Sequence, residues 1–149
     1  MVAHFYEILD PLYIFLKAQG EKKMTDKKME YILDPMYKYR GVVKRVVDGD
    51  TVDVVLDLGF GMTTTQRLRL DDFDAPESWR PRNEAEKIHG EAAKKRAKEL
   101  LEGVDGLIFI TSKDIGVYGR YGASIILPDG TKFKDIMISE GFQKKESYE

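Results

Sequence analysis

Alternating apolar and polar residues in the middle of the chain predict a β-sheet. Segments 39–49 (YRGVVKRVVDG), 51–59 (TVDVVLDLG) and 62–73 (MTTTQRLRLDDF) are rich in β-branched or alternating residues, and the first two end at glycine turns. Successive side chains of a strand point to opposite faces, so Arg67 and Arg69 share one face, opposite Leu68 and Leu70. We therefore expect three consecutive strands.

The pattern then changes to that of a helix. Asn83 is a suitable N-cap, acidic residues follow it in the first turn, and Gly103 can end the helix. The expected apolar stripe consists of Ile88, Ala92, Ala97, Leu100 and Leu101. Two more strands are expected in 107–113 and 121–131. A short closing helix is expected in 132–142, with its buried side formed by Phe133, Ile136, Met137 and Phe142.

This order of elements predicts an α+β fold: a five-stranded OB-type β-barrel with a helix between strands 3 and 4 and a short C-terminal helix. Such barrels commonly bind nucleic acid on one face. The fold alone does not define a function, which has to be argued from the loops.

The first 37 residues differ from the rest. They contain a short echo, ILDPLY at 8–13 and ILDPMY at 32–37, separated by a lysine-rich linker. We interpret 1–37 as an N-terminal extension of unknown role and 38–149 as the barrel domain. The echo is explained by two similar helix-and-turn pieces or by chance; the alternative is a duplicated docking motif or a lid, which makes a protein partner possible through 1–37.

Composition narrows the chemistry. The chain has 149 residues, no cysteine, two histidines and a formal net charge of −2. Thiolate sites and cysteine nucleophiles are therefore excluded, and a bound metal would be a hard cation held by carboxylates. Nucleic-acid binding would need a local basic surface, because the bulk charge does not favour it. The N-terminus lacks the features of a signal peptide, so we expect a cytoplasmic protein, and a monomer.

Three loop sequences carry the candidate chemistry: DGDT at 48–51, RLDDFDAPE at 69–77 and VYGRY at 117–121. Asp50 and Asp74 follow neighbouring strand ends, so their carboxylates could share one hard cation, with backbone carbonyls and waters completing the shell. Pro76 fixes a turn that could hold Glu77 inward. Arg69 offers a planar fork for a phosphate.

Together these three sequences resemble the thermonuclease family of staphylococcal (micrococcal) nuclease-like proteins, over about 39–142. The resemblance implies a calcium site at Asp50, Asp74 and the Ala75 carbonyl, and Glu77 as the carboxylate that orients or deprotonates the attacking water. It further implies that Arg69 and Arg120 clamp the scissile phosphate and that Tyr118 lies beside the nucleotide.

The function implied is a calcium-dependent nuclease that hydrolyses phosphodiester bonds of DNA and RNA with little sugar specificity, favours single-stranded or frayed substrates and leaves 3′-phosphates. The alternative is a non-catalytic OB-fold module of the same type that binds nucleic acid or protein. Gly116 and Val117 stand where the family often has an acidic and a basic residue, which puts the affinity for a terminal phosphate in doubt.

Three other features have simpler interpretations. Trp79 reads as a packing residue or loop anchor rather than a base-stacking platform, and His89 as structural or exposed. The basic cluster Lys94, Lys95, Arg96 and Lys98 is typical of a solvated helix face, although it could provide a weak, salt-dependent hold on a nucleic-acid backbone.

Overall fold

The computed structural model describes residues 37–71 and 73–149. Their elements follow the order β1 Lys38–Asp48, β2 Thr51–Gly59, β3 Met62–Leu70, α4 Glu84–Leu101, β4 Leu107–Thr111, β5 Tyr121–Ile126 and α5 Phe133–Ser139. The predicted 1–37 extension lies outside these residues except for Tyr37. No described helix combines the length and apolarity that crossing a membrane would require.

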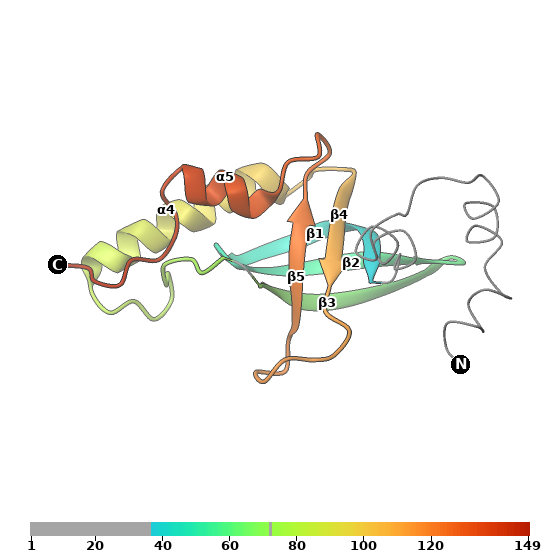
Figure 1. Cartoon of the computed structure of the whole chain (residues 1–149), viewed down its shortest axis with the longest axis horizontal. Helices are drawn as coiled ribbons and strands as arrows, with labels where there is room; N and C mark the ends of the chain where they lie inside the picture. The colour runs from blue at the N-terminus through green and yellow to red at the C-terminus, as the bar shows by residue number, and fades with distance from the viewer. Residues whose placement is uncertain (1–36, 72) are drawn as a thin grey trace, which may run out of the picture. The chain divides into compact units, whose positions relative to one another are not determined.

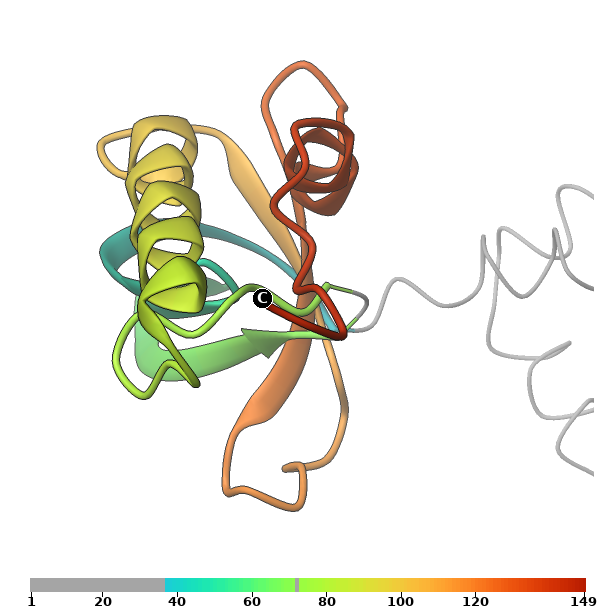
Figure 2. The same cartoon turned by 90° about the vertical axis from the view of Figure 1, so that its left-hand side faces the viewer.

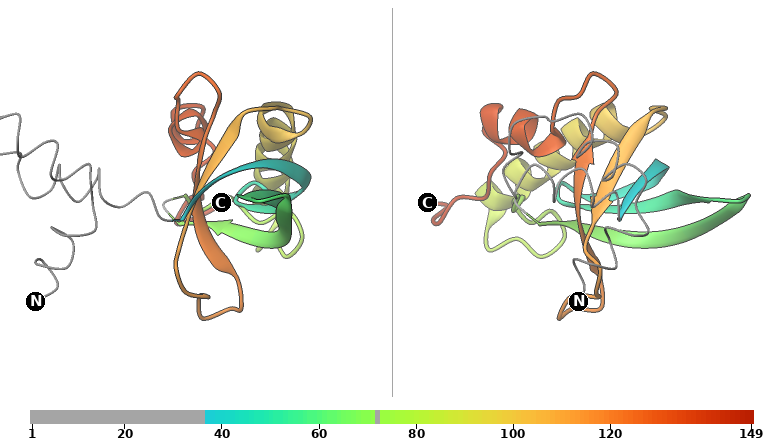
Figure 3. Two further views of the ribbon diagram at one scale, coloured as in Figure 1. Left: turned by 90° about the vertical axis from the view of Figure 1, so that its right-hand side faces the viewer. Right: turned by 45° about the vertical axis from the view of Figure 1, so that its right-hand side comes forward.

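The strands form a closed barrel in the order β1-β2-β3-β5-β4, which confirms the predicted fold (Figure 1). Every neighbouring pair is antiparallel except β3 and β5, whose parallel pairing runs from Leu68 beside Tyr121 to Leu70 beside Ala123. The β2–β3 hairpin extends well beyond the body of the barrel (Figure 3). Its tip carries a fully exposed Phe60 between two glycines of positive φ.

The core lies inside the barrel and beneath the two helices. Inward-facing strand residues such as Val54, Leu68 and Phe109 are buried, and Phe133 and Met137 of α5 close the barrel from one side. Helices α4 and α5 flank the barrel together, and the C-terminal segment runs from α5 down to the loop that follows β3 (Figure 2). The predicted buried side of α5 is thus confirmed for Phe133 and Met137, while Ile136 and Phe142 pack at the edge of the core.

The predicted apolar stripe of α4 is partly wrong. Ile88 is 62% exposed and Ala92 is also exposed, whereas the buried positions are Glu86, Gly90, Ala93, Ala97 and Leu101. These positions are spaced by three or four residues, as a helix face requires. The error arose because the helix packs closely against a loop backbone, so one glycine and one carboxylate replace apolar side chains in the buried stripe.

Gly90 is the clearest sign of this close packing. A Cβ atom at Gly90 would lie 2.6 Å from the carbonyl oxygen of Glu77 and 2.8 Å from the nitrogen of Ser78. The helix therefore supports the backbone of the loop that carries the candidate site, and only glycine allows this approach.

Candidate active site

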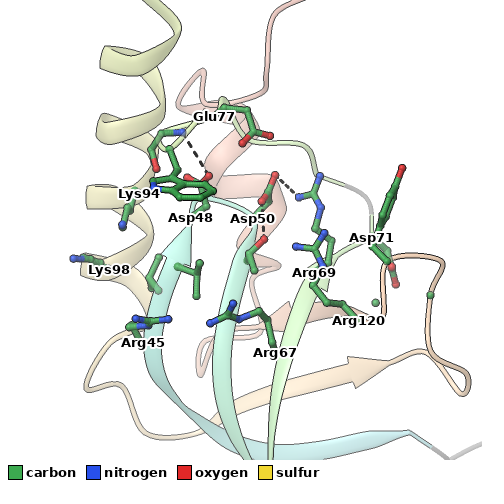
Figure 4. Close-up of a pocket in the computed structure, with 18 of the residues that line it drawn as sticks. Arg45, Asp48, Asp50, Arg67, Arg69, Asp71, Glu77, Lys94, Lys98 and Arg120 are labelled. Carbon is green, nitrogen blue, oxygen red and sulfur yellow. Dashed lines mark hydrogen bonds and ion pairs between the residues drawn. The ribbon is translucent and has the colours of Figure 1, made fainter. Parts of the chain in front are cut away.

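A cleft of about 890 Å³ opens beside the barrel, where β1, β2 and β3 meet α4 and the loop between β4 and β5 (Figure 4). Of the predicted site residues, Asp50, Arg69, Glu77, Tyr118 and Arg120 line it. The remaining two, Asp74 and Ala75, contact that set directly. The fold thus gathers side chains from loops that lie far apart in the sequence.

Asp50 is the most deeply buried acidic residue of the cleft and is only 6% exposed. Its Oδ2 accepts a 2.7 Å hydrogen bond from the backbone N–H of Ala75, and its Oδ1 accepts one of 3.0 Å from the Thr51 hydroxyl. The turn comes this close because Gly49 has no side chain; a Cβ there would lie 2.7 Å from that of Ala75. Burial raises the pKa of Asp50, although Arg69 and these hydrogen bonds act in the opposite direction.

Arg69 joins the two candidate metal-binding carboxylates. Its Nη1 contacts Asp50 Oδ2 and its Nη2 contacts Asp74 Oδ1. The Nη1 atom is buried and has no well-aligned hydrogen-bond acceptor among the described residues, despite its ion pair. One guanidinium therefore pairs with a buried and an exposed carboxylate and leaves a net negative charge, and it lies where a cation shared by them would have to bind.

The donor atoms around Arg69 suit a hard cation better than a soft metal ion. They are carboxylate oxygens, joined by a nearby backbone carbonyl at Ala75, and oxygen ligands are those that calcium takes. Within 37–71 and 73–149 no group of three or more histidine, aspartate or glutamate side chains could hold a metal. A calcium ion here would therefore need backbone oxygens and waters to complete its coordination.

Glu77 projects into the same cleft from the loop after β3 and is 44% exposed at its side chain. Desolvation raises its pKa, and the neighbouring Asp48 and Asp50 raise it further, while Lys144 and Arg69 lower it. The Nζ of Lys144 lies 3.8 Å from Glu77 Oε1. Glu77 is therefore an accessible carboxylate with a pKa above its usual value, as suits a proton acceptor.

Arg120 and Tyr118 approach from the opposite side, on the loop between β4 and β5. A tight turn shapes this loop: the N–H of Gly116 donates to the Arg120 carbonyl at 2.8 Å, and that of Gly119 donates to the Gly116 carbonyl at 2.9 Å. Tyr118 is 85% exposed. In Figure 4 Arg120 lies near Arg69, so two guanidinium groups approach the same part of the cleft.

A buried ion cluster that was not predicted lies behind the site. Glu86 is fully buried, and its Oε2 accepts hydrogen bonds from the Arg82 backbone N–H at 2.7 Å and side-chain Nε at 3.1 Å. Its Oε1 lies 3.4 Å from Lys144 Nζ. Burial opposes ionisation of Glu86, but these groups and the Glu77 backbone outweigh it and lower its pKa to about 2. The spacing of the N-cap Asn83 and Glu86 was the available signal, because it matches a capping box.

The C-terminal segment fastens this cluster to the site. The backbone N–H of Lys144 donates to the Asp74 carbonyl at 2.7 Å, and Arg82 donates to the carbonyls of Lys145 and Glu146. His89 contacts the Tyr148 hydroxyl and the Gly141 carbonyl, both at 2.8 Å, which supports the structural role predicted for it.

Trp79 differs from its prediction. It is 79% exposed, lines the cleft and has the Arg80 guanidinium 4.7 Å from its ring centroid, so the packing interpretation is wrong. The two arginines of SWRPR at 78–82 were the available signal for this exposure. Asp71, which had no predicted role, also lines the cleft, and Asp72 lies outside the described residues.

Comparison with known proteins places part of the chain in a known family. Residues 67–149 match the family described as staphylococcal nuclease homologue. Micrococcal nuclease of Shigella flexneri is 33% identical over 111 residues, which cover 69% of this chain and 56% of that protein. Endonuclease YhcR of Bacillus subtilis (strain 168) is 29% identical over 110 residues, or 70% of this chain and 9% of that protein.

Protein ParB of Escherichia coli is 35% identical over 83 residues, which cover 54% of this chain and 38% of that protein. The chain thus spans little more than half the length of the first of these relatives and less of the other two. The family match covers more than half of the chain and includes Arg69, Asp74, Glu77 and Arg120. The chain belongs to the staphylococcal nuclease homologue family.

Proposed function

We propose that this protein is a metal-dependent nuclease that hydrolyses phosphodiester bonds of DNA and RNA, with calcium as its cofactor and 3′-phosphates as its products. The observation that carries the proposal is the contact of Arg69 with both Asp50 and Asp74, in the cleft that Glu77 and Arg120 also line. Family membership supports nuclease chemistry; the cofactor, the substrates and the product ends belong to the proposal.

In this proposal Asp50, Asp74 and the Ala75 carbonyl hold the cation, which when bound adds positive charge beside the ester oxygens. Arg69 and Arg120 donate hydrogen bonds to the non-bridging oxygens. Attack on a phosphodiester places more charge on these oxygens than the ground state carries, so the two guanidinium groups bind the transition state more strongly than the substrate.

Glu77 accepts the proton of the attacking water. Its side chain is accessible from the cleft, and its raised pKa makes it a better proton acceptor than an ordinary carboxylate. Tyr118, exposed on the facing loop, lies beside the nucleotide. Arg69 is held by two carboxylates, so cation and substrate have to replace part of these contacts when they bind.

The test is cleavage of plasmid and single-stranded DNA or RNA with calcium, with magnesium or with chelator. We expect cleavage with calcium, none with chelator, and losses on the order of a hundredfold for Glu77→Gln and for Arg120→Gln. Glu84→Gln and Arg40→Gln, which change exposed charges away from the cleft, are the matched controls.

Cleavage that survives chelator, or that is unchanged in both site variants, would contradict the mechanism. Binding without cleavage under every condition would support the alternative, a non-catalytic module of the same fold. Product ends are checked by asking whether a polymerase extends the fragments only after phosphatase treatment, as 3′-phosphates require.

A further inference from the structure

A row of cations continues the cleft away from Arg69 and Arg120. It consists of Arg45 on β1, Arg67 on β3, and Lys94 and Lys98 on α4, all of which line the cleft (Figure 4). We call these four residues the basic wall. The proposed mechanism does not use them, and the chain's net charge of −2 does not predict them.

The strand half of the basic wall is held in place by one carboxylate. Asp53 on β2 lies between Arg45 and Arg67 in the sheet register. Asp53 Oδ2 lies 3.2 Å from Arg45 Nη2, and Arg67 donates to Asp53 at 2.6 and 2.9 Å. Two guanidinium groups against one carboxylate leave an excess positive charge, and their side chains remain 62% and 46% exposed.

The helix half of the basic wall is not neutralised in this way. Lys94 and Lys98 are one turn apart and therefore share a face of α4. Across 37–71 and 73–149 neither makes an ion pair, although Glu91 lines the cleft one turn before them. Arg96, between them in sequence, is instead paired with Glu99 and Glu140. The structure thus divides the basic cluster: two lysines line the cleft, and Arg96 is neutralised.

We propose that the basic wall is an extended binding surface for the phosphates of a nucleic-acid strand, beyond the linkage that is cleaved. The inference rests on the proposed function for the position of the scissile phosphate. Flexible lysines and exposed guanidinium groups along a groove suit a chain of regularly spaced anions, whose binding is dominated by phosphate contacts. The exposed Trp79 in the same cleft offers a base a surface on which to stack.

If the basic wall binds phosphates, the affinity for single-stranded nucleic acid should depend on the length of the strand and on the salt concentration. Each phosphate contact to a single strand contributes about 0.7 to the slope of log K against log salt concentration. Replacing both lysines, Lys94→Gln with Lys98→Gln, should therefore reduce that slope by about 1.4 for an oligonucleotide of about 12 nucleotides. A dinucleotide has a single internucleotide phosphate, which the scissile position would take up, so it should bind the variant and the wild type equally.

The experiment is fluorescence anisotropy with labelled single-stranded oligonucleotides, between about 50 and 200 mM salt, with chelator present to prevent cleavage. The control is Lys87→Gln with Lys95→Gln, which removes the same charge from α4 at residues outside the cleft. An unchanged slope in the Lys94 and Lys98 variant, an equal loss in the control, or no measurable binding by the wild type would overturn the proposal.

A second variant tests the strand half by an expected gain in affinity. Asp53→Asn removes the carboxylate between Arg45 and Arg67, so it should strengthen binding of the long oligonucleotide and steepen its salt dependence. No change or a weakening would exclude these two arginines from the surface.

The nuclease proposal and the basic-wall proposal can fail separately. A wild type that never cleaves but shows the lysine-dependent slope refutes the nuclease alone, and one that cleaves without that slope refutes the basic wall alone.

Discussion

Two ion clusters contact the loop that follows β3, and they differ in charge balance, in exposure and in the direction of their pKa shifts. The site cluster of Asp50, Arg69 and Asp74 opens into the cleft, and it contains a buried nitrogen without a well-aligned acceptor. The rear cluster consists of Arg82 and Lys144 around the Glu86 carboxylate, which has no exposed surface and whose Oε1 likewise lacks a well-aligned hydrogen-bond donor in the described part of the chain.

The pKa values show what this difference means. Burial raises the pKa of Asp50, whereas hydrogen bonds outweigh burial and lower that of Glu86 to about 2. The site cluster has two carboxylates against one guanidinium and can therefore accept a further cation. The rear cluster has two cations against one carboxylate, which keep Glu86 ionised. In the proposed mechanism the site cluster serves binding and chemistry, and the rear cluster supports the loop between them.

The sharpest test of this comparison exchanges one glutamate in each region. Glu77→Gln should reduce cleavage by about a hundredfold or more and leave the melting temperature within a degree or two, because Glu77 is partly exposed. Glu86→Gln should instead lower the stability by about 1–3 kcal/mol, since it weakens the acceptor of a buried cluster. Cleavage rates and thermal unfolding of both variants check this; equal effects would remove the distinction.

Calcium should stabilise the site cluster alone. A ligand at a hundred times its Kd adds about 2.7 kcal/mol to the free energy of unfolding, so the wild-type melting temperature should rise by several degrees. Asp50→Asn should abolish the rise, because it removes the buried carboxylate. Asp105→Asn, an exposed change outside the cleft, should retain it. A calcium-dependent rise that persists in Asp50→Asn would place the ion elsewhere.

Gly90→Ala tests whether the helix supports the loop. Alanine is favoured over glycine in a helix by about 1 kcal/mol, but the added Cβ would lie 2.6 Å from the Glu77 carbonyl oxygen. Since that neighbour is backbone, overpacking at about 1–3 kcal/mol should prevail, with a lower melting temperature and slower cleavage. Lys95→Ala, exposed on the same helix, is the control. A more stable Gly90→Ala protein would show that the loop backbone can move away from the helix at little cost in free energy.

The smallest effect concerns acid. The folded-state pKa of Glu86 is about 2, below its ordinary 4.5, so its ionised form stabilises the fold fully above pH 4.5 and this contribution is lost as the pH falls towards 2. The difference in melting temperature between wild type and Glu86→Gln should be constant above about pH 5 and shrink below it. A difference that grows on acidification would contradict the assigned pKa shift.

The fold was predictable because its signals are local. Alternation gave the strands, Asn83 and Gly103 bounded α4, and the three loop motifs identified the residues that meet in the cleft. The rear cluster was not predictable, because Lys144 reaches Glu86 only after α5 has packed onto the barrel. The exposure of Trp79 and the division of the lysines also depend on tertiary packing, which for the lysines decides which face of α4 is buried. For α4 a glycine and a carboxylate occupy that face, so hydrophobicity did not reveal it.

The hydrogen bond from Lys144 to Asp74 has a consequence for synthesis. Ribosomes make a protein from its N-terminus, so the loop bearing Asp74 and Glu77 emerges some seventy residues before the segment that fastens it. Until Lys144 has been translated, the nascent polypeptide lacks this attachment. The finished arrangement of the cleft is thus reached only after this later segment has been made.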